Sequence, residues 1–221
     1  MRAVPSAILE GWPSEIQGTG RPCQPQAFAP GEQRLAYREG VSAFPKHLAA
    51  GLEVRTGARV VGLEAAGRAL ALRLEDGARL EARTVVLALA PEQAIELLAT
   101  FPAPPVAVRS ASALLDMARS HPCLTVMATY PAPTPRPTWH VCYPERSSIV
   151  QLISNESSKR PGQGALGLVV QAHAAWSSRN VDDPGWPEAL LREATALQGE
   201  WVAHPAATEP VLRAFYRNLY A

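Results

Sequence analysis

The hydrophobic and polar positions of residues 40–98 predict a series of short elements. Ser42 is placed to cap a helix of about two turns, and Gly51 stands where a left-handed residue ends such a helix. Farther along, apolar residues follow the two-residue period of strands, and Asp76-Gly77 is the strongest short turn signal of a hairpin. Strands are therefore expected over residues 53–56, 59–64, 69–74 and 78–82.

The stretch Val85–Ala90 has a different pattern, because its apolar residues are continuous rather than alternating. Such a run is typical of a strand that is buried on both faces. Pro91 and Glu92 then open a helix that contains Ile95 and Leu98.

The remaining chain predicts a mostly antiparallel sheet with two helices. Prolines and glycines make long regular elements improbable before Gln33. Ser110 can cap a helix that ends at Arg119, and Pro187 starts a helix that Gly199 stops. Residues 211–220 fit either a helix or a strand by periodicity. A meander of strands is expected over 123–130, 139–143, 148–154 and 166–173, and the fold class is α+β.

Composition changes this picture by excluding several classes of protein. The 21 Lys and Arg balance 20 Asp and Glu without a basic stripe, so no nucleic-acid partner is expected. The longest apolar runs fall far short of the ~20 residues that a membrane helix needs. No apolar signal segment follows Met1, so a cytoplasmic location is expected.

Candidate chemistry is sparse. Three cysteines are too few for a disulfide framework and are interpreted as free thiols. Two His-x-Cys units fit strand residues better than a zinc site, so no metal is assigned. No nucleophile and base emerge, so no catalytic residue is assigned; Asp182-Asp183 is interpreted as a turn and His173 as structural. Trp176, Trp186 and Trp201 fit core anchors better than a pocket.

The order of these segments resembles a known family. The stretch from "GVSAFPKHLAAGLEVRTGARVV" to "TVVLALAPEQAIELL", followed by "HPCLTVMATYPAP", "SNESSKRPGQG", "VVQAHAAWSSRNVDD" and "LRAFYRNLYA", is similar to renalase-like flavoproteins of the FAD-dependent amine oxidase superfamily. The resemblance favours a strand for the last of these segments. It covers about four-fifths of the chain in family order, Met1–Glu39 being the uncertain part.

The resemblance implies FAD as the cofactor and a set of residues that contact it. Val60 matches the strand valine whose backbone contacts the adenine end of FAD. The strand-to-helix turn that passes close to the dinucleotide corresponds to Ala88, Leu89, Ala90 and Pro91. The alternative is that these five are only core strand residues.

The chain also departs from the family. The Gly-x-Gly-x-x-Gly turn that holds the FAD pyrophosphate is not found; Gly18-Thr19-Gly20 lacks the third glycine and is followed by Arg21-Pro22. The glycine-rich segment that seals the flavin near the family's C-terminus has no match either. The chain is therefore expected to be an interior fragment or a truncated form, in which FAD binding is doubtful.

These inferences give a domain plan and two candidate functions. Residues 1–39 are expected to be an irregular segment of the substrate domain, 40–100 a partial FAD-binding domain and 101–221 an antiparallel-sheet substrate domain. The first candidate is part of an FAD-dependent oxidoreductase that oxidises a small molecule by hydride transfer to flavin. The second is a non-catalytic remnant that binds a small molecule or a protein. Surfaces left uncovered favour self-association in either case.

Overall fold

The computed structural model describes residues 8–18, 34–118, 120–160, 162 and 164–217 of the chain. These residues form two compact units: one contains the described parts of 1–50 and 121–216, and the other contains the described parts of 51–120 together with Arg217. The second unit is thus inserted in the sequence of the first.

The first unit is built on a six-stranded sheet with the strand order β11-β7-β10-β9-β8-β2. Adjacent strands are antiparallel in the β7-β10, β10-β9 and β9-β8 pairs, whereas β2 runs parallel to β8. A separate two-stranded sheet pairs β1 with β3. The strand bounds are β1 (Ile8–Glu10), β2 (Ile16–Gln17), β3 (Leu35–Tyr37), β7 (Ser120–Tyr130), β8 (Val141–Cys142), β9 (Val150–Asn155), β10 (Leu166–Ala172) and β11 (Ala207–Arg217).

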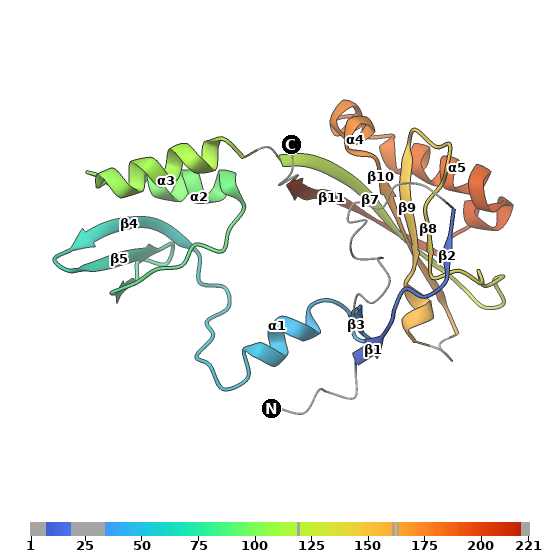
Figure 1. The fold of residues 1–221 in the computed structure, drawn as a ribbon, viewed down its shortest axis with the longest axis horizontal. Helices are drawn as coiled ribbons and strands as arrows, with labels where there is room; N and C mark the ends of the chain where they lie inside the picture. Colours follow the sequence, from blue (N-terminus) through green and yellow to red (C-terminus); the bar gives the residue numbers. More distant parts are fainter. Residues whose placement is uncertain (1–7, 19–33, 119, 161, 163, 218–221) are drawn as a thin grey trace. The chain divides into compact units, whose positions relative to one another are not determined.

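Two helices complete the core of this unit. Helix α4 (Ala174–Asn180) follows β10, and α5 (Trp186–Gln198) packs against β9 and β10 (Figure 1). Because inward side chains of β10 alternate, Leu166, Leu168 and Val170 all enter one buried cluster with residues of both helices. The 3₁₀ turns Glu156–Lys159 and Glu200–Ala203 follow β9 and α5.

The N-terminal segment is fixed to the sheet by side chains that lie far apart in sequence. Trp12 donates its indole N–H to Ser158 Oγ at 2.8 Å, and its ring stacks on His140 with centroids 6.3 Å apart. Lys159 Nζ lies 4.0 Å from the centroid of the Trp12 ring. These contacts compensate for the short pairing of β2, whose two residues form few ladder hydrogen bonds. Helix α1 (Ala43–Leu48) completes the described N-terminal part, and Phe44 contacts the ring of Tyr37.

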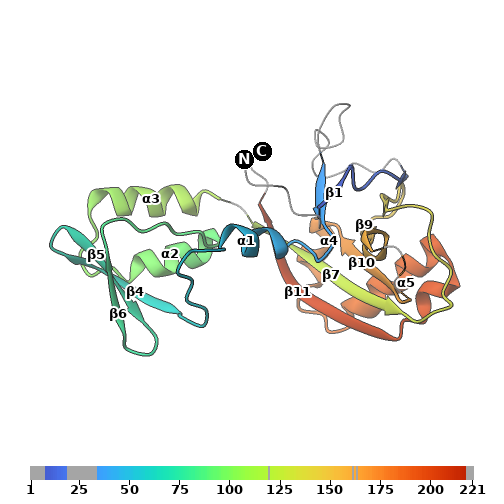
Figure 2. The ribbon, with the colours of Figure 1, turned by 90° about the horizontal axis from the view of Figure 1, so that it is seen from below.

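The second unit is a three-stranded antiparallel meander with two helices. Its strands are β4 (Val60–Ala66), β5 (Ala69–Leu74) and β6 (Arg79–Ala82), in the order β4-β5-β6. Helix α2 (Pro91–Ala99) packs against β4, and α3 (Val106–Asp116) packs against α2 (Figure 2). The buried cluster of this unit contains only Leu63, Leu97 and Phe101 among its described residues.

The structure confirms the α+β class and most of the predicted elements. The Asp76-Gly77 turn joins β5 and β6, and Asp76 Oδ1 accepts a hydrogen bond from the N–H of Ala78 at 2.9 Å. Gly51 and Gly199 have φ values of 83° and 107°, as expected for residues that end helices. The ambiguous C-terminal stretch is a strand over Ala207–Arg217.

Several predictions about local structure were wrong. Ser42 is the N-cap residue of α1 as predicted, but its side chain makes no capping bond. Residues 53–56 form no strand. Helix α3 begins at Val106 after Pro105, not at Ser110, because proline is compatible with a helix start and not with its interior. Strand β7 pairs with β10 rather than β8, so the four central strands are not a simple meander.

The largest difference concerns Val85–Ala90, which forms no ladder with any strand in the part of the chain that the structure describes. The backbone is not helical, but a strand needs a neighbour to receive its hydrogen bonds. The helix predicted after it is present as α2, with Ala90 as its N-cap residue and Pro91 as its first residue. Helix α4 was not predicted, because His173 at its N-cap is not one of the residues that typically cap a helix.

Candidate functional site

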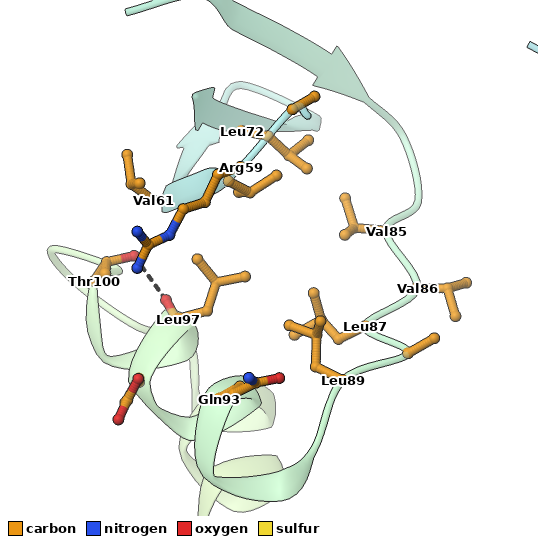
Figure 3. A pocket seen from close by; sticks show the side chains of 14 residues that line it. Arg59, Val61, Leu72, Val85, Val86, Leu87, Leu89, Gln93, Leu97 and Thr100 are labelled. Atoms are coloured by element: carbon orange, nitrogen blue, oxygen red, sulfur yellow. Dashed lines mark hydrogen bonds between the residues drawn. The ribbon is translucent and has the colours of Figure 1, made fainter. Parts of the chain in front are cut away.

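A cavity of about 690 Å³ lies within the second unit, between the meander, the segment 85–89 and helix α2 (Figure 3). Its walls come from three parts of the sequence that are close together only in the fold. The lining residues are Ala58, Arg59, Val60, Val61, Leu72, Val85, Val86, Leu87, Ala88, Leu89, Gln93, Glu96, Leu97 and Thr100.

The first wall is the beginning of β4, where the strand is irregular. The register with β5 shifts between Val60 and Gly62, so Val61 is an extra residue in the pairing. Bulges of this kind bend a strand and redirect its side chains, and they are frequent beside binding sites. Leu72 of β5 adds an apolar side chain to the same wall.

The second wall is the extended segment 85–89. The labelled side chains of Val85, Leu87 and Leu89 point toward the cavity, whereas Val86 points away from it (Figure 3). Val86 is 84% exposed, and Leu89 is 46% exposed. The segment therefore has the side-chain alternation of a strand although it has no partner strand among the described residues.

The third wall is one face of α2, and it supplies most of the polar groups. Gln93, Glu96 and Thr100 follow the three- and four-residue spacing of a single helix face. The hydroxyl of Thr100 is already engaged. It accepts a hydrogen bond from the N–H of Leu63 at 2.9 Å. It also donates one to the carbonyl of Leu97 at 2.7 Å (Figure 3). Gln93 and Glu96 are thus the polar side chains of this wall that can contact a ligand.

Three of the five residues predicted to contact the cofactor line this cavity. Val60 lies at the start of β4, and Ala88 and Leu89 lie on the opposite wall. Ala90 and Pro91 do not line it, because they form the first turn of α2. That these residues bind a cofactor stays a prediction.

Sequence reasoning missed the contribution of α2 to this cavity. Only the apolar residues Ile95 and Leu98 of that helix had been singled out, whereas its cavity face carries Gln93, Glu96 and Thr100. The helical spacing of these three polar residues was the available signal. The position of Arg59 and Leu72 beside them depends on the pairing of β4 with β5, which local sequence does not specify.

The other candidate residues have structural roles. Trp176 and Trp186 belong to the core cluster of the first unit, as predicted; the side chain of Trp201 lies outside what the structure describes. His173 Nε2 lies 3.2 Å from the carbonyl oxygen of Ser147, and Asp183 Oδ1 accepts the N–H of Gly185 at the start of α5. The Asp182-Asp183 pair is therefore a turn, as expected.

The described cysteines and the Gly18 turn are also explained by packing. Burial raises the pKa of both the Cys123 and Cys142 thiols, which makes them poor nucleophiles at neutral pH. A Cβ atom on Gly18 would lie 1.9 Å from the carbonyl oxygen of Tyr143, so glycine is required there by the close approach of two backbones. Cys23 and residues 19 and 20 lie outside the described part of the chain.

Within the described residues, no group of three His, Cys, Asp or Glu side chains is arranged to hold a metal ion. None of the helices in the described ranges combines the length and apolar character needed to span a membrane. The cavity lining contains no paired nucleophile and base: its charged residues are Arg59, which pairs with Glu75 at 3.2 Å, and Glu96. The arrangement is suited to holding a flat, mostly apolar group with a few polar edges.

Comparison with known proteins places the chain in a structural context. A family model described as flavin containing amine oxidoreductase matches residues 6–211. Cyclohexylamine oxidase from Brevibacterium oxydans IH-35A is similar in structure, with a TM-score of 0.64 and 18% identity; the match covers 82% of this chain and 40% of that one. Wild-type putrescine oxidase bound to putrescine is similar with a TM-score of 0.61 and 15% identity, covering 81% and 39%.

The chain thus spans about two-fifths of the length of these solved structures. At such low identity the similarity shows the fold. No curated protein matches the sequence significantly.

Proposed function

Because the chain belongs to the flavin-containing amine oxidoreductase family, we propose that it forms part of an FAD-dependent oxidoreductase whose residues 51–120 hold the adenosine end of FAD. The observation that carries this proposal is the cavity, which brings Val60 together with Ala88 and Leu89 from a separate segment. The family is flavin-containing, and FAD is its implied cofactor.

The cavity is suited in size and character to an adenosine group. Sites for small molecules have volumes of roughly 300–1,000 Å³, with mostly apolar walls and a few polar groups. The volume of about 690 Å³ lies in this range, and Val61, Leu72 and Leu87 provide apolar surfaces for a flat ring. The side chains of Gln93 and Glu96 offer an amide and a carboxylate for the ring amine and the ribose hydroxyls.

The same residues fit the pyrophosphate of FAD poorly. Phosphates are held by backbone N–H groups at helix N-termini and by unpaired cations. The cation that lines the cavity, Arg59, is engaged by Glu75, and the Glu96 carboxylate would repel a phosphate. We therefore assign the nucleoside end, and not the pyrophosphate, to this cavity.

When bound, the flavin would supply the acceptor for a hydride removed from a substrate C–H bond. The six-stranded sheet of the first unit supports a substrate-facing role, because the family resemblance assigns its strands there. The substrate class proposed is a small amine or a related ring compound, as in renalase-like enzymes, and the location proposed is the cytoplasm.

Binding of FAD and of AMP to the full chain tests this assignment. The fluorescence anisotropy of FAD would be followed while the protein is added. AMP would serve as the competitor, because it carries only the nucleoside end and one phosphate. The proposal predicts competition between the two ligands. Leu89→Asp places a charge in the cavity and should weaken binding by roughly tenfold or more. A tenfold loss of affinity corresponds to about 1.4 kcal/mol.

The matched control is Leu114→Asp. Leu114 lies on α3, is 68% exposed and does not line the cavity, so this variant should bind both ligands like the unmodified chain. Equal effects of the two substitutions, or FAD binding that AMP does not displace, would contradict the assignment. Absence of flavin binding under all conditions would favour the second candidate, a non-catalytic binding module.

A further inference from the structure

We propose that protonation of His140 controls the docking of residues 12–18, so that this N-terminal strap is held on the six-stranded sheet at neutral pH and released in mild acid. The strap contains β2, which pairs with β8 at one end of the strand order. All residues concerned belong to the first unit. The switch is therefore independent of the proposed function, whose cavity lies in the second unit.

His140 contacts the strap through both its backbone and its ring. Its N–H donates to the carbonyl of Glu15 at 2.8 Å, and its own carbonyl accepts the N–H of Asn155 from β9 at 2.8 Å. Its Nδ1 lies 3.2 Å from the backbone nitrogen of Ser14 and 3.3 Å from the hydroxyl oxygen of the same residue. The ring also stacks on Trp12. His140 thus links the strap to the sheet.

The hydrogen bond from Ser14 fixes the protonation state of the ring. A backbone N–H can only donate, so Nδ1 has to accept, which requires a neutral imidazole with its proton on Nε2. When the ring takes up a second proton, Nδ1 becomes a donor that faces the N–H of Ser14. The hydroxyl of Ser14 can exchange its donor and acceptor roles, but the N–H cannot. Protonation therefore replaces a hydrogen bond with two opposed donors.

The 3₁₀ turn after β9 places a second cation beside the same aromatic ring. Lys159 Nζ lies 4.0 Å from the centroid of the Trp12 ring, and the Lys159 side chain is only 13% exposed, so water screens its charge poorly. An indole ring attracts a cation, but a protonated His140 would have to share this ring with Lys159. Glu156 is bound to Lys159 at 2.7 Å and accepts from Ser154, so its carboxylate is already engaged.

The other charged side chains on the surrounding elements do not offset this repulsion. Arg38, after β3, donates to the carbonyl of Lys159 at 3.4 Å and adds a further cation. Arg136, on the loop before His140, donates to the carbonyl of Gly164. Glu15 of the strap is exposed, where water and salt screen its carboxylate. Histidine normally changes its charge between pH 5 and pH 8, so release is expected in this range.

Release of the strap would open one edge of the sheet. The N–H of Val141 is bound by the carbonyl of Glu15, and the N–H of Tyr143 is bound by the carbonyl of Gln17. Without the strap these donors of β8 would face solvent, as on an edge strand. The rest of the sheet should persist, because β7, β9 and β10 are held by the core cluster that α4 and α5 complete.

Hydrogen exchange of the full chain at pH 8 and pH 5 tests the switch. Protection is expressed relative to the intrinsic exchange rate at each pH, because that rate itself changes with pH. The Tyr143 amide reports the docked strap, and the amides of β10 report the rest of the sheet. We expect the protection of Tyr143 to fall by roughly tenfold from pH 8 to pH 5, the effect of about one lost hydrogen bond, while β10 stays protected.

Two histidine variants assign the response. In His140→Asn an amide oxygen can accept the N–H of Ser14 and cannot be protonated, so protection of Tyr143 should be high and equal at both pH values. His173→Gln is the matched control. His173 Nε2 lies 3.2 Å from the carbonyl oxygen of Ser147, and a protonated ring can still donate this bond. The control should therefore keep the full pH response of the unmodified chain.

The proposal is overturned if the protection of Tyr143 is the same at pH 8 and pH 5 in the unmodified chain, or if the response persists in His140→Asn. Loss of the response in His173→Gln would assign it to the wrong histidine. Low protection of Tyr143 in His140→Asn at both pH values also refutes it, because the acceptor at this position would then not hold the strap. An equal loss of protection in β10 would mean that acid unfolds the whole sheet, which contradicts a local switch.

Discussion

Thr100 joins the end of helix α2 to the outer edge of β4, and its removal gives the sharpest test of how the second unit is held together. Its hydroxyl accepts the N–H of Leu63 and donates to the carbonyl of Leu97. The N–H of Leu63 points away from β5, so without Thr100 this edge of the sheet would present a free donor. Thr100→Val keeps the shape of the side chain and removes both hydrogen bonds.

The expected cost follows from the surroundings of the two atoms. A hydrogen bond contributes about 0.5–1.5 kcal/mol, and a buried donor left unpaired costs about 1–3 kcal/mol. Leu63 is 5% exposed, but Thr100 itself lies at an exposed helix end where water can partly replace the hydroxyl. We therefore expect Thr100→Val to lower the free energy of unfolding of this unit by about 1–2 kcal/mol.

Hydrogen exchange of the Leu63 amide is the direct assay. A loss of 1–2 kcal/mol corresponds to a roughly 5- to 30-fold faster exchange, provided that exchange follows opening of the unit. Thr100→Ser keeps the hydroxyl and loses only a methyl group, so it should retain most of the protection. The reasoning is refuted if Leu63 exchanges at the same rate in Thr100→Val and in the unmodified chain, or if the serine variant is as damaging as the valine variant.

Two further predictions concern the first unit. Tyr130 is fully buried, and its hydroxyl donates a hydrogen bond to the carbonyl of Val202. Burial raises the pKa of Tyr130 to about 12. Above pH 10 the unfolded chain therefore loses a proton that the folded chain keeps. Stability should fall by about 2–3 kcal/mol between pH 10 and pH 12, and in a Tyr130→Phe variant this part of the urea-unfolding pH profile should be flatter. Gly18 and Gly77 have similar φ values of 84° and 86°. Gly77→Ala should therefore lower the free energy of unfolding by about 1–2 kcal/mol, the cost of a left-handed conformation for a residue with a Cβ atom. Gly18→Ala should cost about 1–3 kcal/mol more, because its Cβ would meet the Tyr143 carbonyl; equal losses in the two unfolding curves would contradict this.

Local chemistry in the sequence was sufficient to predict the elements that depend on local interactions. The β5-β6 hairpin is determined by Asp76-Gly77, and α5 begins and ends with the residues that its proline and glycine indicate. The start of α3 was misplaced because Ser110 resembles a cap, while Pro105 already provides a compatible helix start. Both outcomes depend on a few neighbouring residues.

The features that sequence reasoning missed depend on pairing between distant segments. Nothing near Tyr130 indicates that β7 lies beside β10 rather than β8. The strand predicted over Val85–Ala90 has the composition of a buried strand but lacks a neighbour among the described residues, and composition alone cannot supply one. The cavity was therefore predictable only in part: two of its walls contain the residues expected to contact the cofactor, and the polar face of α2 was overlooked.

The placement of β2 has a consequence for synthesis on the ribosome. Ser14 bonds His140, 126 residues later, and Trp12 bonds Ser158, so the N-terminal segment must wait until most of the protein has been made before it can find its neighbours. Residues 51–120 are contiguous and can fold while the sheet is still incomplete. Translation therefore favours an order in which the inserted unit forms before the N-terminal segment docks.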